Sequence, residues 1–357
     1  MLVPHLPALI LAPMQGLTDA PMRAYQSESG AFTFAVSEFL RISGDVPSAK
    51  MFFRHVPELH CGGRTPAGLP VQVQLLGGDA GRMAASAVVA YEAGAKAVDI
   101  NFGCPAPTVN RHDGGAALLK YPSRIQEIVA AIRGALPLEI PVSAKLRLGW
   151  DSADSIFENA ERAAAGGASW ITIHGRTRVQ GYAPPADWVR IGQVRDQLSI
   201  PVVANGDLWS IDDFKRCRDM TGCTQFMLGR GALANPYLPQ QVACELGIAT
   251  KACTDEESGP IDWVPHLNRL IALTAQIEGK SLVDKRSDHF LVCRLKQWLN
   301  LADKQGQFTE FEAVKRLETT AELFAFLGES KAPQPPIMGE PDFQAVSVPP
   351  LLGARGF

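Results

Sequence analysis

The stretch Asp99-Ile100-Asn101-Phe102-Gly103-Cys104-Pro105 predicts the end of a buried strand that breaks into a loop. Its approach, Ala97–Ile100, is short, apolar and partly β-branched, which is typical of a strand in a parallel sheet. Gly103 relaxes the backbone and Pro105 prevents an immediate helix, so we expect Cys104 on a loop just past the carboxyl end of a strand. Ligands bind at that edge in α/β folds. Taken alone, the cysteine is equally well explained as a small buried thiol.

The composition narrows the class of protein. The chain has 357 residues, of which 46% are hydrophobic, enough for one large core and a smaller second unit. The net charge of −3 does not attract nucleic acid, so any such binding requires a local basic patch. The seven cysteines are scattered and form no CxxC pair, so we expect reduced thiols, no metal site and a cytoplasmic protein. The N-terminal apolar stretch is only strand-length, and we expect neither a signal peptide nor a membrane span.

Eight short apolar runs recur between residues 8 and 228, and helix-like stretches separate many of them. The runs are Ala8–Ala12, Phe34–Ser37, Val71–Leu75, Ala97–Ile100, Val142–Leu146, Trp170–Ile173, Pro201–Ala204 and Gln225–Leu228. The helix-like stretches include Arg82–Glu92, Pro122–Gly134, Ser155–Ala165, Trp188–Gln197 and Ile211–Arg218. This alternation predicts an α/β fold, a (β/α)8 TIM barrel. A doubly wound sheet is the alternative, but no GxGxxG motif follows the first strand.

The pattern changes to helices alone at about Cys244. Ile261–Ile277, Asp288–Ala302 and Thr309–Leu327 carry helical periodicity without intervening strands. We therefore expect a barrel domain over residues 1–243 and a small all-helical domain over 244–330. Residues 331–357 are rich in Pro and Gly, and we expect a partly disordered tail.

Polar residues cluster where the first, third and fifth strands end. Pro13, Met14 and Gln15 form a turn against which a flat ring could lie. Gln72 and Gln74 put two amides on one face of the third strand. Lys145 and Arg147 put two cations on one face of the fifth strand. The residues that flank them are apolar, which argues against a solvent-exposed charged edge.

The last three strands end in glycine-containing polar loops. These are His174-Gly175-Arg176, Asn205-Gly206-Asp207 and Gly229-Arg230-Gly231. In barrels, the loops after the last two strands often bind phosphate through backbone N–H groups, and Arg230 adds a cation. The two loops after the seventh and eighth strands favour a phosphate-bearing cofactor. All the strand-end groups together favour a flat, phosphorylated, hydrogen-bonding cofactor across the barrel mouth, and flavin mononucleotide (FMN) fits. Gln74 would then bond the ring edge, Lys145 would place positive charge near N1–C2, and Cys104 would act as an acid over the ring.

Seven motifs in the same order resemble those of the tRNA-dihydrouridine synthases. They are Ala12-Pro13-Met14, Val73–Gly77, Asp99–Pro105, Lys145-Leu146-Arg147, His174–Thr177, Asn205-Gly206-Asp207 and Gly229–Ala232. The resemblance implies FMN in the barrel domain, NADPH as hydride donor, hydride transfer to C6 of a tRNA uracil, and protonation of C5 by Cys104. It also implies that Asn101 orients the uridine or flavin and that Lys145, His174 and Arg176 hold flavin or uracil carbonyls.

Three further segments are similar to the bacterial C-type branch of that family, which modifies position 16 of the tRNA D loop. They are Ser37–Arg41, Arg147–Asp151 and Arg294–Leu299. The resemblance implies a tRNA-binding helical domain, and we expect Arg41, Arg147, Arg294 and Lys296 to line one exposed basic surface. Arg111-His112-Asp113 depart from the family pattern, which expects smaller residues there. We expect a monomer.

Two other functions compete with this hypothesis. One is an FMN barrel oxidoreductase of a small molecule such as a dihydropyrimidine, which would have no need of the basic set. The other is an RNA-binding scaffold on an inactive barrel, which the presence of Cys104, Lys145 and the phosphate loops argues against.

Overall fold

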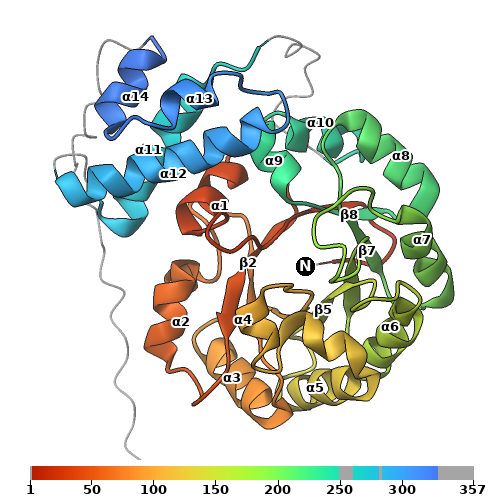
Figure 1. Cartoon of the computed structure of the whole chain (residues 1–357). Helices are drawn as coiled ribbons and strands as arrows, with labels where there is room; N and C mark the ends of the chain where they lie inside the picture. The colour runs from red at the N-terminus through yellow and green to blue at the C-terminus, as the bar shows by residue number, and fades with distance from the viewer. Residues whose placement is uncertain (1, 249–259, 281–283, 329–357) are drawn as a thin grey trace, which may run out of the picture.

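The computed structural model describes residues 2–248, 260–280 and 284–328. Eight parallel strands pair in chain order and β8 returns to β1, so that the barrel is closed (Figure 1). The strands are β1 Ala8–Leu11, β2 Phe34–Arg41, β3 Val71–Leu76, β4 Val98–Phe102, β5 Val142–Arg147, β6 Trp170–His174, β7 Val202–Asn205 and β8 Gln225–Leu228. The predicted TIM barrel is confirmed, and each of the eight apolar runs overlaps one strand.

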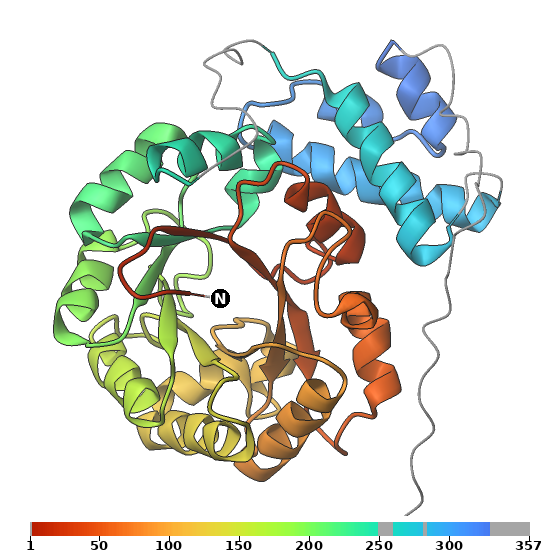
Figure 2. The same ribbon diagram turned by 180° about the vertical axis from the view of Figure 1, so that it is seen from behind.

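The helices of the barrel unit lie mainly around its outside (Figures 1 and 2), but the short α4, Pro107–Asn110, lies at the carboxyl ends of the strands. They are α1 Ala20–Ser27, α2 Ala49–His55, η1 Pro57–Cys61, α3 Ala80–Glu92, α4 Pro107–Asn110, η2 Gly115–Lys120, α5 Pro122–Ala135, α6 Ser155–Ala165, α7 Trp188–Gln197, α8 Ile211–Thr221, α9 Arg230–Ala234 and α10 Leu238–Glu245. The short ones have no sequence periodicity long enough to predict them. Among them, α4 and η2 build the segment that follows Cys104, and α9 follows β8.

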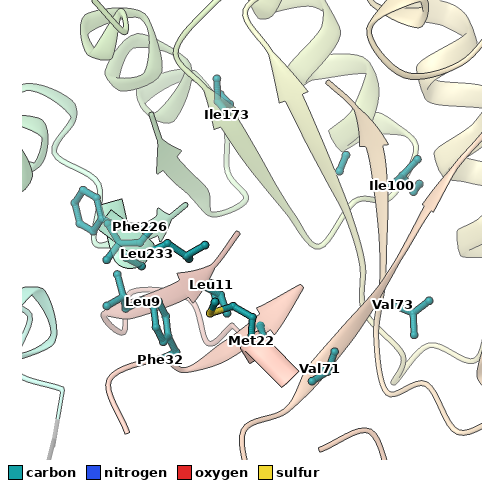
Figure 3. Close-up of a cluster of buried hydrophobic side chains, with 14 of the residues drawn as sticks. Leu9, Leu11, Met22, Phe32, Val71, Val73, Ile100, Ile173, Phe226 and Leu233 are labelled. Atoms are coloured by element: carbon teal, nitrogen blue, oxygen red, sulfur yellow. The ribbon is translucent and has the colours of Figure 1, made fainter. Parts of the chain in front are cut away.

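Two apolar layers hold the barrel together. The outer layer lies between strands and helices, and Leu9, Val73 and Ile100 are among its members (Figure 3). A separate inner cluster fills part of the barrel interior; it consists of Ile10, Ala12, Phe34, Val36, Trp170, Val203 and Met227. Alternation along each strand produces the two layers, because successive side chains point to opposite faces.

The barrel side formed by β3, β4 and β5 carries buried polar residues instead. These are Gln72, Gln74, Asp99, Asn101 and Ser143, each no more than 8% exposed. They are connected: Gln74 Nε2 donates to Asp99 Oδ2 at 2.7 Å, and Ser143 Oγ donates to Asp99 Oδ1. Burial raises the pKa of Asp99 to about 6. This network lies under the loop that carries Cys104.

Four helices follow the barrel; the first packs against α1, the second packs against α9, and the last two pack on the second (Figure 1). They are α11 Trp263–Glu278, α12 Lys285–Asp303, α13 Phe311–Val314 and α14 Thr320–Phe326. The expected stretch Thr309–Leu327 is two short helices, because Thr319 and Glu322 form a capping box that begins a new one. The expected boundary at residue 243 falls within α10, and the expected tail, residues 331–357, lies outside the described residues. Within the described residues, no helix is long and apolar enough to cross a membrane.

Candidate active site

A cavity of about 610 Å³ opens at the carboxyl ends of the strands, a volume typical of sites for small ligands. Most of the residues expected at the site line it: Pro13, Met14, Gln15, Asn101, Cys104, Lys145, Arg147, His174, Asn205, Gly206, Asp207, Gly229 and Arg230. The carboxyl ends of all parallel barrel strands meet at one edge, which is why residues so far apart in the chain come together.

One wall is the loop between β1 and α1, where Pro13 and Met14 present apolar surface. Thr18 shapes this loop, because its hydroxyl accepts a hydrogen bond from the Met14 N–H at 2.7 Å and donates to the Ala12 carbonyl at 3.2 Å. Gly16 adopts a φ of +73°, which favours glycine. The wall is therefore a preformed apolar surface of the kind that a planar ring would contact.

Lys145 supplies a half-buried cation from β5. Its Nζ donates to Asn205 Oδ1 at 3.1 Å, and Asn205 Nδ2 donates to the Met227 carbonyl at 2.8 Å. The backbone carbonyl thus orients the Asn205 amide so that its oxygen faces the lysine. Burial, followed by the neighbouring Arg147, lowers the pKa of Lys145 to about 8. The side chain is still mainly an ammonium at pH 7.

His174, at the end of β6, is only 8% exposed. Burial, with Arg147, Lys145 and other cations around it, holds its pKa well below the usual range, so the imidazole is neutral at pH 7. Its Nδ1 has no hydrogen-bond partner among the residues that the structure describes. A buried ring nitrogen without a partner suits a ligand that completes its hydrogen bonding.

The loops after β7 and β8 form the other end of the cavity. The Arg230 guanidinium lies 4.6 Å from the Tyr182 ring centroid and 4.8 Å from that of Trp209, and these aromatic contacts orient it. In the described ranges, no carboxylate forms an ion pair with Arg230. A Cβ at Gly231 would lie 2.0 Å from the Leu208 carbonyl oxygen, so only glycine fits that turn. This end combines a cation that no described carboxylate neutralises with a tightly packed glycine turn at the start of α9.

Cys104 is half-buried at the cavity on the loop after β4. Asn101 anchors this loop, because its Oδ1 accepts from the N–H groups of Gly103 and Cys104 at 2.9 Å each. Arg147 holds the same loop through its Nε, which donates to the Gly103 carbonyl at 2.8 Å. Burial raises the pKa of the Cys104 thiol, so it carries its proton at neutral pH. That protonation state suits an acid rather than a nucleophile.

Three expected site residues lie beside the cavity without lining it. Gln74 is fully buried beneath it: its Nε2 bonds Asp99, and its Oε1 accepts from Asn101 at 2.9 Å. Arg176 is 1% exposed and forms a two-pronged ion pair with Asp207. Arg41 lies with its Nη2 3.4 Å from the Thr108 carbonyl.

The expected exposed basic surface is wrong for Arg294. Its side chain is 8% exposed; it donates to the Gly16 carbonyl at 2.6 Å and the Leu17 carbonyl at 2.5 Å, and it pairs with Asp19 at 2.8 Å. Lys296 is half-buried and donates to two backbone carbonyls near α13. Both cations therefore stabilise the fold, because groups from other segments of the chain accept their hydrogen bonds. Arg294 ties α12 to the cavity wall formed by the β1–α1 loop.

We expect Arg294→Met to lower the free energy of unfolding by about 1.5–3 kcal/mol, since it removes charge-assisted bonds to two carbonyls and a carboxylate. Urea unfolding measures this change. Lys304→Met, at the exposed end of the same helix, is the matched control and should stay within ~0.5 kcal/mol of the parent. Equal stability of Arg294→Met and Lys304→Met would show that the clamp contributes nothing.

Three aromatic residues of the cavity were missed by the sequence reasoning: Phe39, Tyr182 and Trp209. Phe39 reaches the cavity because β2 is longer than expected and shifts its register between Val36 and Phe39. The other two lie in loops after β6 and β7. For Tyr182 and Trp209 the only signal in the sequence was an aromatic residue within ten positions of a strand end, which is weak. Phe39 lies in the segment Ser37–Arg41 that carries the family resemblance, but no site role was assigned to it. The described residues contain no group of three or more His, Cys, Asp or Glu that could hold a metal ion.

Comparisons with known proteins give both family and fold. Residues 10–322 match the family described as Dihydrouridine synthase (Dus). The chain is 41% identical over 325 residues to the tRNA-dihydrouridine(16) synthase of Shewanella oneidensis, covering 90% of this chain and 98% of that protein. It is 40% identical over 323 residues to the Neisseria meningitidis serogroup B protein of the same name, covering 90% and 94%.

Among solved structures, histamine dehydrogenase from Rhizobium sp. 4-9 superposes with a TM-score of 0.52 at 15% identity, over 76% of this chain and 49% of that one. A 2-naphthoyl-CoA reductase superposes with a TM-score of 0.51 at 14% identity, over 67% of this chain and 50% of that one. At these identities the likeness concerns the fold alone, and this chain spans about half the length of either structure.

Proposed function

We propose a function from one premise: the chain belongs to the dihydrouridine synthase family. It reduces a uridine of the tRNA D loop, at position 16, to 5,6-dihydrouridine, with FMN as cofactor and NADPH as reductant. The names of its relatives support the tRNA substrate and the position. The observation that carries the proposal is that the half-buried, protonated Cys104 lines the same cavity as the cations Lys145 and Arg230.

The residues at the cavity fit FMN. The apolar wall of Pro13 and Met14 suits the face of a flavin ring, and the unpartnered Nδ1 of His174 suits a polar edge. Arg230 and the loop glycines suit the phosphate. An excess of cations over carboxylates at the cavity favours an anionic ligand. Gln74 already donates to Asp99 and accepts from Asn101. It could bond the flavin ring only through its second Nε2 proton or its second Oε1 lone pair.

FMN held by Pro13, Met14 and Arg230 would supply the hydride for C6 of the uracil, with NADPH as the reductant. Lys145 lines the cavity as a cation and would stabilise the negative charge that a bound flavin gains on reduction. Cys104 gives its proton to C5, and the resulting thiolate regains a proton from water. Asn101 keeps the thiol in place by holding the backbone N–H groups of the loop. Hydride and proton together saturate the C5–C6 bond.

Mapping dihydrouridine in D loops of tRNA from cells with and without the gene tests this function. We expect the position-16 modification to disappear with the gene and to return when the chain is supplied. Unchanged D-loop dihydrouridine would contradict the proposal. It would then favour a small-molecule substrate, provided the purified protein is yellow with flavin.

We expect Arg230→Ala to weaken FMN binding by about 10- to 100-fold, because one charge-assisted phosphate bond contributes ~1.5–3 kcal/mol. Titration of the apoprotein with FMN, followed by flavin fluorescence, measures the dissociation constant. Arg316→Ala, an exposed arginine on the helical side, serves as control and should leave FMN affinity unaltered. If Arg230→Ala binds FMN with the parental affinity, the phosphate does not bind at this end of the cavity.

A further inference from the structure

A second cavity, of about 330 Å³, lies beside the first and shares Pro107 with it. Its other lining residues are Asn110, Arg111, Trp150 and Arg178. They come from the segment after Cys104 and from the loops after β5 and β6. The Arg178 N–H bonds the Gly149 carbonyl at 2.8 Å, which holds the last two loops together. The second cavity is therefore part of the mouth of the candidate active site.

Trp150 holds two cations without neutralising them. The Lys120 Nζ lies 3.8 Å and the Arg178 Cζ 4.6 Å from its ring centroid. An aromatic face attracts a cation but, unlike a carboxylate, leaves its net charge in place. Across residues 2–248, 260–280 and 284–328, no carboxylate pairs with Lys120, Arg178 or Arg111, whereas Arg124, four residues after Lys120, is paired. Positive charge is therefore uncompensated at this part of the mouth.

The walls of this second cavity also hold unused hydrogen-bond donors. Asn110 Nδ2 and Arg178 Nε are buried and have no partner in the part of the chain that the structure describes. The Asn110 amide is fixed in orientation, because a flip would break the hydrogen bond that its Oδ1 accepts from the Ala117 N–H at 3.1 Å. Unused N–H groups next to uncompensated cations suit an anion with several acceptor oxygens, and phosphate is such an anion.

We propose that Arg111, Lys120 and Arg178, here called the rim cations, bind a phosphate of the RNA backbone beside the target uridine. This inference rests on the proposed function, which supplies the RNA. A base that enters the cavity to reach Cys104 leaves its own sugar and phosphates outside, at the mouth. The rim cations also replace Arg294 and Lys296 as the cations available to RNA. NADPH carries phosphates too, so the experiment must separate the two sources.

The test measures binding of an unmodified tRNA transcript to the holoenzyme at several salt concentrations. For the double variant Lys120→Gln/Arg178→Gln we expect about tenfold weaker binding. We also expect the slope of log affinity against log salt to fall by about 1 for each lost phosphate contact. The second arm measures the KM for NADPH in flavin reduction without RNA. The expected effect is confined to the tRNA arm.

Arg64→Gln/Lys96→Gln is the matched control, since it removes two exposed cations just before β3 and β4, at the end of the barrel opposite the mouth. The proposal requires this control to bind tRNA within about twofold of the parent. Equal loss in both double variants would mean general charge attraction and would overturn the site. An unchanged tRNA slope with a raised NADPH KM would assign the phosphate to the dinucleotide instead. The binding assay involves no turnover, so it tests the phosphate site alone. Dihydrouridine analysis with the parent protein tests the proposed uridine reduction separately.

Discussion

Cys104→Ala is expected to lower the rate of dihydrouridine formation by roughly 10²–10⁴, the usual cost of losing a positioned general acid. FMN binding and NADPH-dependent flavin reduction should persist, because neither needs the thiol. The thiol is suited to the role, since burial raises its pKa and it stays protonated at neutral pH. Single-turnover reduction of tRNA by the prereduced holoenzyme isolates the step that the mutation affects.

Cys61→Ala, an exposed thiol outside the cavity, is the control and should react like the parent. Near-parental turnover of Cys104→Ala would exclude the cysteine as the acid. Loss of FMN from the variant would instead point to a structural role for the cysteine. Cys104 is tightly packed, because a Cβ added at Gly115 would lie 3.1 Å from the Cβ of Cys104.

Lys145→Met is expected to slow NADPH-dependent flavin reduction by roughly 10²–10³, the range measured when one preorganised electrostatic partner is removed from an active site. The lysine has a lowered pKa, about 8, so its charge is complete at pH 6 and is lost as the pH rises through that value. A bound anion stabilises the ammonium form of Lys145, so the charge is then lost at a higher pH. The parent should therefore reduce flavin more slowly above pH 8, whereas Lys145→Met should lack this decline.

Stopped-flow flavin absorbance between pH 6 and 10 measures both effects. Lys50→Met, at an exposed position of α2, controls for the loss of a lysine and should keep the parental rate and profile. If Lys145→Met reduces flavin at the parental rate, the positive charge at this position is not needed for electron uptake.

The strands and the composition of the cavity edge could be predicted from the sequence because both depend on local patterns. Ala97–Ile100 is apolar over a strand's length, and the Gly103-Cys104-Pro105 break follows at once. Once the strands are parallel and closed into a barrel, their carboxyl ends meet at one edge. Lys145, His174 and Arg230 therefore share a cavity although 85 residues separate the first from the last in the chain.

The role of each charged side chain depends on contacts between segments that are distant in the chain. Arg294 looked like a free cation on a helix, but its partners Gly16 and Leu17 lie 278 and 277 residues away, and no local pattern announces them. Arg178 and Lys120 gave no signal in the sequence, and it is the ring of Trp150 that holds them at the mouth. A side chain's type is a local property, whereas the occupancy of its donors depends on what the fold brings within about 3 Å. Local patterns in the chain are enough to predict which chemical groups gather at the barrel mouth. Which of those groups stay free to bind a ligand depends on the packing of segments that are distant in the chain.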